Sequence, residues 1–236
     1  MTDAEATMSL LEHLEELRRR LIITIAAVVI GAIIGFFLSD PALQVLRAPL
    51  PAQYDHLIFT RVTEIFELRL KIGIFIGIAL AMPVILYQVW RFVSPGLTTR
   101  ERHAIWPLLL AALLLFALGI EVGYVIVPFA LAFLLGLAPA GIPALLTVGE
   151  YVGFITTMML AFGLVMEFPI VLVALSRVGL LSYRRVAAQR RLIILGIVIF
   201  AVVVTPGGDP FSPSILSAVM YLLFEGSLLV MRLAGR

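Results

Sequence analysis

Charged residues at the edges of apolar segments are the features of this sequence that could do chemistry. In the run His13 to Leu21, HLEELRRRL, two glutamates precede three arginines, and an apolar segment follows directly. Arginines beside a membrane span resist translocation and keep their end of the span in the cytoplasm. Acidic residues contribute little to orientation, so Glu12, Glu15 and Glu16 indicate another role, such as holding a cationic partner at the membrane surface.

A second acidic position lies between two apolar segments, in the loop Ser94 to His103, SPGLTTRERH, where Glu101 is the only acid. If Glu16 and Glu101 face one another at the inner surface, they form an anionic pocket for guanidinium groups. Arginine pairs with carboxylates in a bidentate manner and lysine cannot, so such a pocket selects arginine-bearing peptides.

A purely structural interpretation of both sites stays open. Ser9 with Glu12, and Thr98 with Glu101, have the spacing of helix capping boxes. Ion pairs at i,i+4 spacing, Glu15 with Arg19 and Glu16 with Arg20, are each worth only about 0.2–0.5 kcal/mol.

Acidic residues also occur inside apolar segments, where an ionised carboxylate is costly. Glu167 lies in AFGLVMEFPI, directly before Phe168 and Pro169, and Glu121 lies in the preceding apolar segment. Such residues indicate function more often than structure. Thr147 and Glu150 again have capping-box spacing, which we interpret as structural.

The composition is that of a membrane protein with several spans. Of the 236 residues, 62% are hydrophobic and 14% charged, with a mean hydropathy of +1.12, which is too apolar for a soluble domain. The only lysine, Lys71, lies in no phosphate-binding loop, and there is no cysteine. Motifs of hydrolases and proteases are missing. We therefore expect no enzyme activity, no cofactor or metal and no binding to nucleic acid. The acidic N-terminus predicts no cleaved signal peptide.

The apolar segments predict an all-α integral membrane protein with six transmembrane helices in a single domain, 1–236. A hydrocarbon core of roughly 30 Å needs about 20 residues per helix. The six candidates are 21–38, 71–93, 104–137, 149–178, 192–204 and 215–231. Segment 192–204 is too short for an undistorted bilayer, and the glycine- and proline-rich turn after it predicts a short hairpin of the last two helices.

Basic residues orient this bundle. Thirteen of the 17 fall on one side if the N-terminus is cytoplasmic, so both termini are predicted to be cytoplasmic. Residues 1–20 are then a cytoplasmic amphipathic helix. Residues 39–70 form a periplasmic cap, in which TEIFELRLK at 63–71 predicts a helix lying in the membrane interface.

Eight short motifs spread over nearly the whole chain occur together in one family. They are HLEELRRRL at 13–21, RAPL at 47–50, TEIFELRLK at 63–71, MPVILYQVWRFVSPGL at 82–97, RERH at 100–103, FGLVMEFP at 162–169, VTPGGDPFS at 204–212 and YLLFE at 221–225. The chain resembles the TatC family, the receptor subunit of the twin-arginine protein translocase. The resemblance implies a cupped six-helix bundle in the cytoplasmic (inner) membrane that binds the paired arginines in signal peptides of folded cargo.

The resemblance also implies roles for single residues. Glu16 and Glu101 match the acids of the signal-peptide patch, and its neighbouring positions match Arg18, Phe92, Leu97 and Arg102. Pro49 and Pro83 match structural prolines. The polar residue of the concave face, where a single-span TatA- or TatB-type helix engages, matches Glu167. The region that docks TatB-like partners matches Val202, Val203 and Thr205.

Three positions depart from the family pattern: His103, Pro213 and Glu121, the last of which stands where many members have an apolar residue. Glu121 is assigned with Glu167 to an intramembrane polar site for a partner helix, and the two could share a proton.

The function expected from this resemblance is a core subunit that nucleates an export complex driven by the proton gradient. Its partners would be TatA- and TatB-type subunits, signal peptides, membrane lipid and further copies of itself. The main alternative is a small proton-coupled secondary transporter with an acidic site at the membrane midplane. A membrane protease is a remote third.

Overall fold

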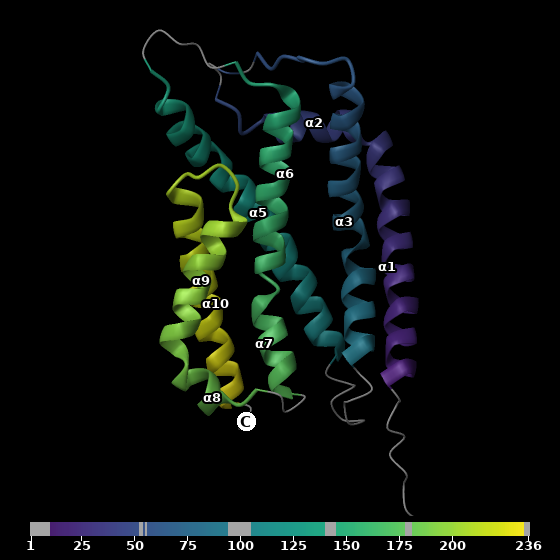
Figure 1. Cartoon of the computed structure of the whole chain (residues 1–236), viewed down its shortest axis with the longest axis vertical. Helices are drawn as coiled ribbons and strands as arrows, with labels where there is room; N and C mark the ends of the chain where they lie inside the picture. Colours follow the sequence, from purple (N-terminus) through teal and green to yellow (C-terminus); the bar gives the residue numbers. More distant parts are fainter. Residues whose placement is uncertain are drawn as a thin grey trace, which may run out of the picture.

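The computed structural model describes residues 10–51, 54, 56–93, 105–139, 145–177 and 181–233, and these residues form a bundle of helices without strands (Figure 1). The helices are α1 (Leu10–Phe37), α2 (Ser39–Arg47), α3 (Glu64–Val93), α5 (Ile105–Gly136), α6 (Val148–Val165), α7 (Phe168–Arg177), α8 (Tyr183–Ala188), α9 (Arg190–Val204) and α10 (Phe211–Leu233). The expected all-α membrane fold is thus confirmed.

Five stretches of the described chain are long and apolar enough to cross a membrane: α1, α3, α5, α6 together with α7, and α10. Helix α9, with 15 residues, is shorter than these, as its sequence predicts. One predicted boundary is wrong. The amphipathic run 63–71 does not form a separate interfacial helix, because α3 begins at Glu64 and continues through it. Helix α1 runs unbroken from Leu10 through the charged segment into the apolar one.

Helix α1 packs against α3 through backbone contacts between glycines. A Cβ atom on Gly31 would lie 2.8 Å from the carbonyl oxygen of Gly77, and one on Gly35 would lie 2.7 Å from that of Gly73. Two small residues four apart on each helix let the backbones approach this closely. Only 11% of the most apolar stretch of α1 is buried, so this one seam fixes its position.

Helix α6 is the centre of the bundle. Helices α6 and α7 together make one span. Of its most apolar stretch 61% is buried, more than in any other span of the described chain. Gly119 and Gly123 of α5 lie against the backbone of α6, since their Cβ atoms would meet Phe162 and Met159 at 2.5 and 2.8 Å. The side chains of Val152, Ile155, Met158 and Phe162 are fully buried around this crossing.

The segment between α1 and α3 forms a cap that is tied to the bundle by polar contacts. The Glu64 carboxylate accepts hydrogen bonds from the backbone N–H groups of Thr60 (2.8 Å) and of Gly149 at the start of α6 (3.0 Å). The hydroxyl of Tyr151 donates to the carbonyl of Leu46 in α2 (2.6 Å). The predicted cap of α6 is confirmed: the Thr147 hydroxyl accepts from the Glu150 N–H (3.3 Å).

The second half of the chain contains a break and a tight turn. The predicted fourth span is interrupted at Met166 and Glu167, between α6 and α7. Pro169 follows directly, and because proline has no backbone N–H it cannot donate to the carbonyl of the preceding turn. The turn before α10 has Gly207 and Gly208 at positive φ (98° and 70°), a conformation that glycine adopts without strain. The predicted helical hairpin of α9 and α10 is present (Figure 1).

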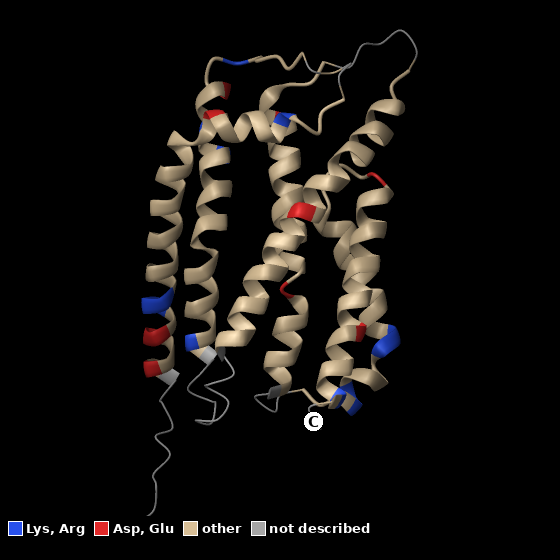
Figure 2. Cartoon of the chain, turned by 180° about the vertical axis from the view of Figure 1, so that it is seen from behind, with Lys and Arg blue, Asp and Glu red and all other residues tan. Residues whose placement is uncertain are grey.

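Charge is concentrated at the two ends of the bundle (Figure 2). The long middle parts of the helices carry few charged positions in this view. Helix α1 begins, and α10 ends, at the same end of the bundle (Figure 1). This arrangement fits an even number of membrane crossings.

The glycine seam leads to a stability prediction. We expect Gly77→Ala to lower the free energy of unfolding by about 1–3 kcal/mol, because the new methyl would lie 2.5 Å from the backbone nitrogen of Ala32. Gly226→Ala is the matched control, since a methyl at this position would meet nothing within 4 Å and helix propensity favours alanine. Thermal unfolding in detergent measures both, and equal midpoints would contradict the seam.

Candidate functional site

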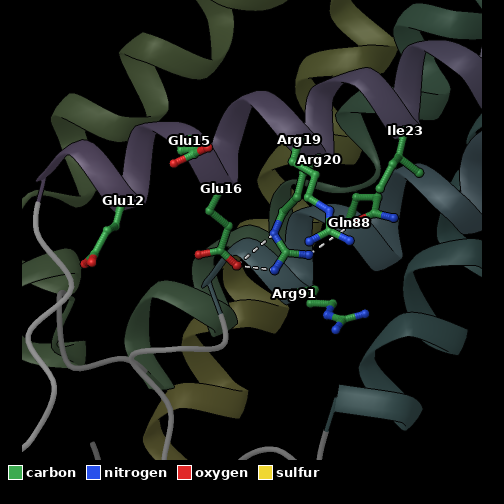
Figure 3. Close-up of a pocket in the computed structure, with 8 residues that line it drawn as sticks. All are labelled: Glu12, Glu15, Glu16, Arg19, Arg20, Ile23, Gln88 and Arg91. Carbon is green, nitrogen blue, oxygen red and sulfur yellow. Dashed lines mark hydrogen bonds and ion pairs between the residues drawn. The ribbon is translucent and has the colours of Figure 1, made fainter.

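The first candidate site lies where the start of α1 meets the last turns of α3. The two helices are antiparallel there, and together they line a cavity of about 420 Å³ (Figure 3). Its lining residues are Glu12, Glu15, Glu16, Arg19, Arg20 and Ile23 from α1, with Gln88 and Arg91 from α3. The cavity is therefore lined mostly by charged side chains at the edge of an apolar bundle.

Glu16, Arg20 and Gln88 point toward one another inside this cavity (Figure 3). The guanidinium of Arg20 binds the Oε1 atom of Glu16 through two nitrogens, and the Nε contact is 3.1 Å. A third nitrogen donates to the amide oxygen of Gln88 (3.3 Å). The side chains of Arg20 and Glu16 are only 14% and 17% exposed, so this pair is screened less than a surface ion pair.

The Glu16 carboxylate can accept a hydrogen bond from one further donor. Its Oε2 atom is inaccessible to solvent and has no hydrogen-bond partner among the described residues. A carboxylate offers about four acceptor positions on its two oxygens. A buried acceptor without a donor is costly, so a second cation or hydrogen-bond donor at Oε2 would be bound favourably.

The register of α1 against α3 explains why these side chains meet. Eleven residues separate Arg20 from Gly31 on α1, and eleven separate Gln88 from Gly77 on α3. Eleven residues are close to three helical turns, so each pair lies on one helix face. The glycine contact between the two helices therefore sets the polar contact three turns away. In the same register Glu16 lies opposite Phe92.

Aromatic contacts border the cavity. The ring of Phe92, a residue that the family resemblance assigns to the site, stacks on His13 with centroids 4.4 Å apart and planes at 21°. Arg91 donates to the hydroxyl of Tyr87 (3.2 Å) and lies over its ring. These rings lie near the cavity without lining it, and flat rings of this kind are surfaces on which arginine side chains can stack.

Other predicted members of this site have different outcomes. Glu101, Leu97 and Arg102 lie outside the described residues. Arg18 is exposed on α1. The predicted pair of Glu16 with Arg20 is confirmed, whereas no ion pair joins Glu15 to Arg19 in the described part of the chain.

A second candidate site is a groove of about 710 Å³ between the α6–α7 break and α9. Its lining is apolar except for Glu167. That side chain is 9% exposed, and its Oε1 atom has no hydrogen-bond partner within the described chain. From α9 the groove is lined by Ile193, Gly196, Ile197, Phe200 and Val204. One unsatisfied acid in an apolar groove of this kind suits a helix that brings a donor.

The structure does not bring the other predicted partner residues to this groove. Val202 and Val203 are 59% and 77% exposed and are not among the residues that line it. Thr205 is buried, and its hydroxyl donates to the carbonyl of Ala201 in its own helix (2.8 Å). Glu121 is exposed, and it does not line the groove with Glu167.

Sequence reasoning missed Gln88 as a member of the site between α1 and α3. Gln88 is only 9% exposed although it is polar, and it lies inside the motif MPVILYQVWRF. A polar amide within an otherwise apolar helix was the available signal, but its partner depends on the register of two helices. Pro49 follows α2 and Pro83 lies inside α3, and their structural roles remain predictions.

Comparison with known proteins gives one consistent family. The family model described as Sec-independent protein translocase protein (TatC) matches residues 12–218. The chain is 37% identical to the TatC protein of Carboxydothermus hydrogenoformans over 94% of this chain and 92% of that protein. It is 38% identical to the one of Aquifex aeolicus over 97% of both. Its fold is similar to the crystal structure titled Twin Arginine Translocase Receptor- TatC, with a TM-score of 0.79, 38% identity and coverage of 95% of this chain and 100% of that chain.

The Glu16–Arg20 contact leads to a local prediction. We expect Arg20→Gln to speed amide hydrogen exchange over residues 12–20 by about three- to tenfold, because a half-buried ion pair contributes on the order of 1 kcal/mol to the first turns of α1. Arg19→Gln is the control, because Arg19 is exposed on the same turn. Equal exchange in both variants would mean that the pair does not hold this end of α1.

Proposed function

Because the chain belongs to the TatC family of Sec-independent protein translocases, we propose that it is the subunit that binds the twin-arginine signal peptide of folded precursor proteins. In this proposal the cavity between α1 and α3 receives the arginines, and the apolar part of the signal lies along the bundle. Bound signal then nucleates an export complex with TatA- and TatB-type single-span subunits and further copies of this chain.

The observation that carries the proposal is the state of the Glu16 carboxylate. It already holds one guanidinium, that of Arg20, and its second oxygen is buried without a donor. A site that binds an internal arginine has the geometry and charge to bind another. The rings of Phe92 and His13 beside it suit a planar guanidinium better than a compact ammonium group.

The second acid of the proposed receptor is Glu101, which follows from the family motif alone. Two carboxylates spaced for two arginines would distinguish a signal with a pair from one with a single arginine. Arg18, Arg102 and Leu97 are proposed as neighbours of the bound peptide on the same grounds. How these three residues surround the bound peptide is part of the proposal.

The apolar groove with Glu167 is proposed as the docking site of a single-span partner helix. It is supported by the buried, unpartnered Oε1 atom and by the length of apolar lining along α9. A partner with a hydroxyl or amide at this depth would satisfy Glu167. The outer face of α9 around Val202 and Val203, and Thr205 at its end, is the alternative docking region that the family motif suggests.

The proposed location is the cytoplasmic membrane with both termini inside. The arginines near the start of α1, in α8 and at the end of α10 support this orientation, because basic residues are retained on the cytoplasmic side. The proposal assigns the energy for transport to the proton gradient. It also assigns the exposed apolar faces of α1 and α5 to contact with lipid or other subunits.

We predict that Glu16→Gln weakens binding of a twin-arginine signal peptide about ten- to hundredfold, because a charge-assisted hydrogen bond contributes on the order of 1.5–3 kcal/mol. The same loss is expected for Glu101→Gln. Binding is measured by fluorescence anisotropy with the purified protein in nanodiscs.

Two controls accompany this measurement. Glu150→Gln removes an exposed carboxylate that lines neither the cavity nor the groove, and it should leave affinity within about twofold. A twin-lysine peptide should bind weakly to the unsubstituted protein. If Glu16→Gln and Glu150→Gln behaved alike, the receptor assignment would be wrong. Equal binding of the twin-arginine and twin-lysine peptides would favour the alternative function, a proton-coupled secondary transporter.

For the groove, we predict that a photoreactive amino acid at Phe200 crosslinks a co-reconstituted TatA- or TatB-type subunit. Glu167→Leu should reduce this labelling about fivefold, since an interhelical hydrogen bond contributes about 1–2 kcal/mol, while Glu167→Gln should retain most of it. Labelling from Val203 but not from Phe200 would instead place the partner on the outer face of α9.

A further inference from the structure

Helix α5 exposes an apolar face that is interrupted by one acid. Along it Leu110, Leu114, Leu118, Val125 and Phe129 are between 52% and 64% exposed. Glu121 is exposed in the same series, three residues after Leu118 and four before Val125. This spacing puts all six side chains on one side of the helix. We call this surface the α5 outer face.

The α5 outer face points away from the bundle. Gly119 and Gly123 form the opposite side of α5, where they touch the backbone of α6. Glu121 lies two residues from each of them, which is roughly 200° around a helix of 3.6 residues per turn. The acid therefore faces outward, away from both the α6 contact and the groove that contains Glu167.

The position of Glu121 is also far from both ends of α5. The helix runs from Ile105 to Gly136, so Glu121 is near its middle. At 1.5 Å per residue it lies about 22–24 Å from either end, beyond the reach of a glutamate side chain. An ionised carboxylate among the apolar side chains of this helix is costly unless it is paired or protonated.

The described part of the protein supplies no partner for this carboxylate. Within the described residues no hydrogen bond or ion pair reaches Glu121, and its helix neighbours at i−4, i−3 and i+4 are Ala117, Leu118 and Val125. The neighbour at i+3, Tyr124, has a hydroxyl, but that group donates to the carbonyl of Val45 (2.8 Å).

An acid in this position calls for a cationic occupant. Lipid chains offer no donor, and a second copy docked through the same face would place two glutamates together. A helix with a lysine or arginine at the same depth would neutralise the charge and bury the flanking leucine, valine and phenylalanine side chains. Charged residues inside membranes are usually paired in this way.

We propose that the α5 outer face docks a transmembrane helix of another protein, and that this helix carries a lysine or arginine opposite Glu121. This surface is separate from the cytoplasmic cavity and from the Glu167 groove. The docking proposal does not depend on the receptor function proposed above. It also gives a role to an acid that departs from the family pattern.

The test uses full-length protein in lipid vesicles. The chain has no cysteine, so Ala132→Cys, exposed further along α5, gives a single dye site. The probe is a synthetic leucine–alanine helix of about 20 residues with one central lysine and a quencher. Its match has leucine at that position.

We expect the lysine helix to bind about tenfold more tightly than the leucine helix, since a hydrogen-bonded pair between membrane helices is worth about one decade in affinity. Glu121→Leu should abolish that preference. Leu110→Ala, on the same face but three turns away, should keep it. Glu121→Leu removes only an outward-facing side chain, and thermal unfolding in detergent verifies that the variant is folded.

Three results would overturn the proposal. They are equal binding of both helices, a lysine preference that survives Glu121→Leu, and quenching between labelled copies of the chain that requires Glu121 without any peptide. The last would show that a second copy occupies the face.

Discussion

The backbone contact between α1 and α3 is the constraint on which the charged cavity between these two helices depends. The buried residues of α1 in the described structure are the glycines of this seam, so the contact between Gly31 and Gly77 is the main constraint on its height and rotation. Three turns away, that register brings Arg20 to Gln88 and puts Glu16 beside Phe92. The chemistry at the membrane surface is thus determined by close packing inside the membrane, because a shift of one residue along α1 would turn these side chains by about 100°.

The same principle explains how two acids of similar type acquire different environments. Glu16 is held at the end of the seam, with one oxygen bound and the other buried without a donor. Glu167 lies at the break between α6 and α7, where it lines an apolar groove. In each place the other described residues leave a carboxylate incompletely satisfied. Incompletely satisfied polar groups cost stability, and they are tolerated where a partner completes them.

Much of this could be predicted from sequence because the signals are local. Apolar segments gave the spans, the i,i+4 spacing gave the Glu16–Arg20 pair, and Thr147 with Glu150 gave a helix cap. The start of α3 was predicted wrongly. The charged residues at the beginning of this helix were assigned to a separate helix, although the apolar run continues them without a break. Gln88 and the outward direction of Glu121 depend on which faces of different helices meet, and periodicity within one helix does not contain that information.

The most direct test of this account combines the seam with the site. A photoreactive amino acid at Ile23, which lines the cavity between α1 and α3, is exposed to a twin-arginine signal peptide in purified, folded protein. The account predicts strong capture in the unsubstituted protein and in Gly226→Ala, and weak capture in Gly77→Ala, although every side chain of the cavity is still present. Equal capture in all three would contradict it, because peptide binding would then not depend on the register of α1 against α3.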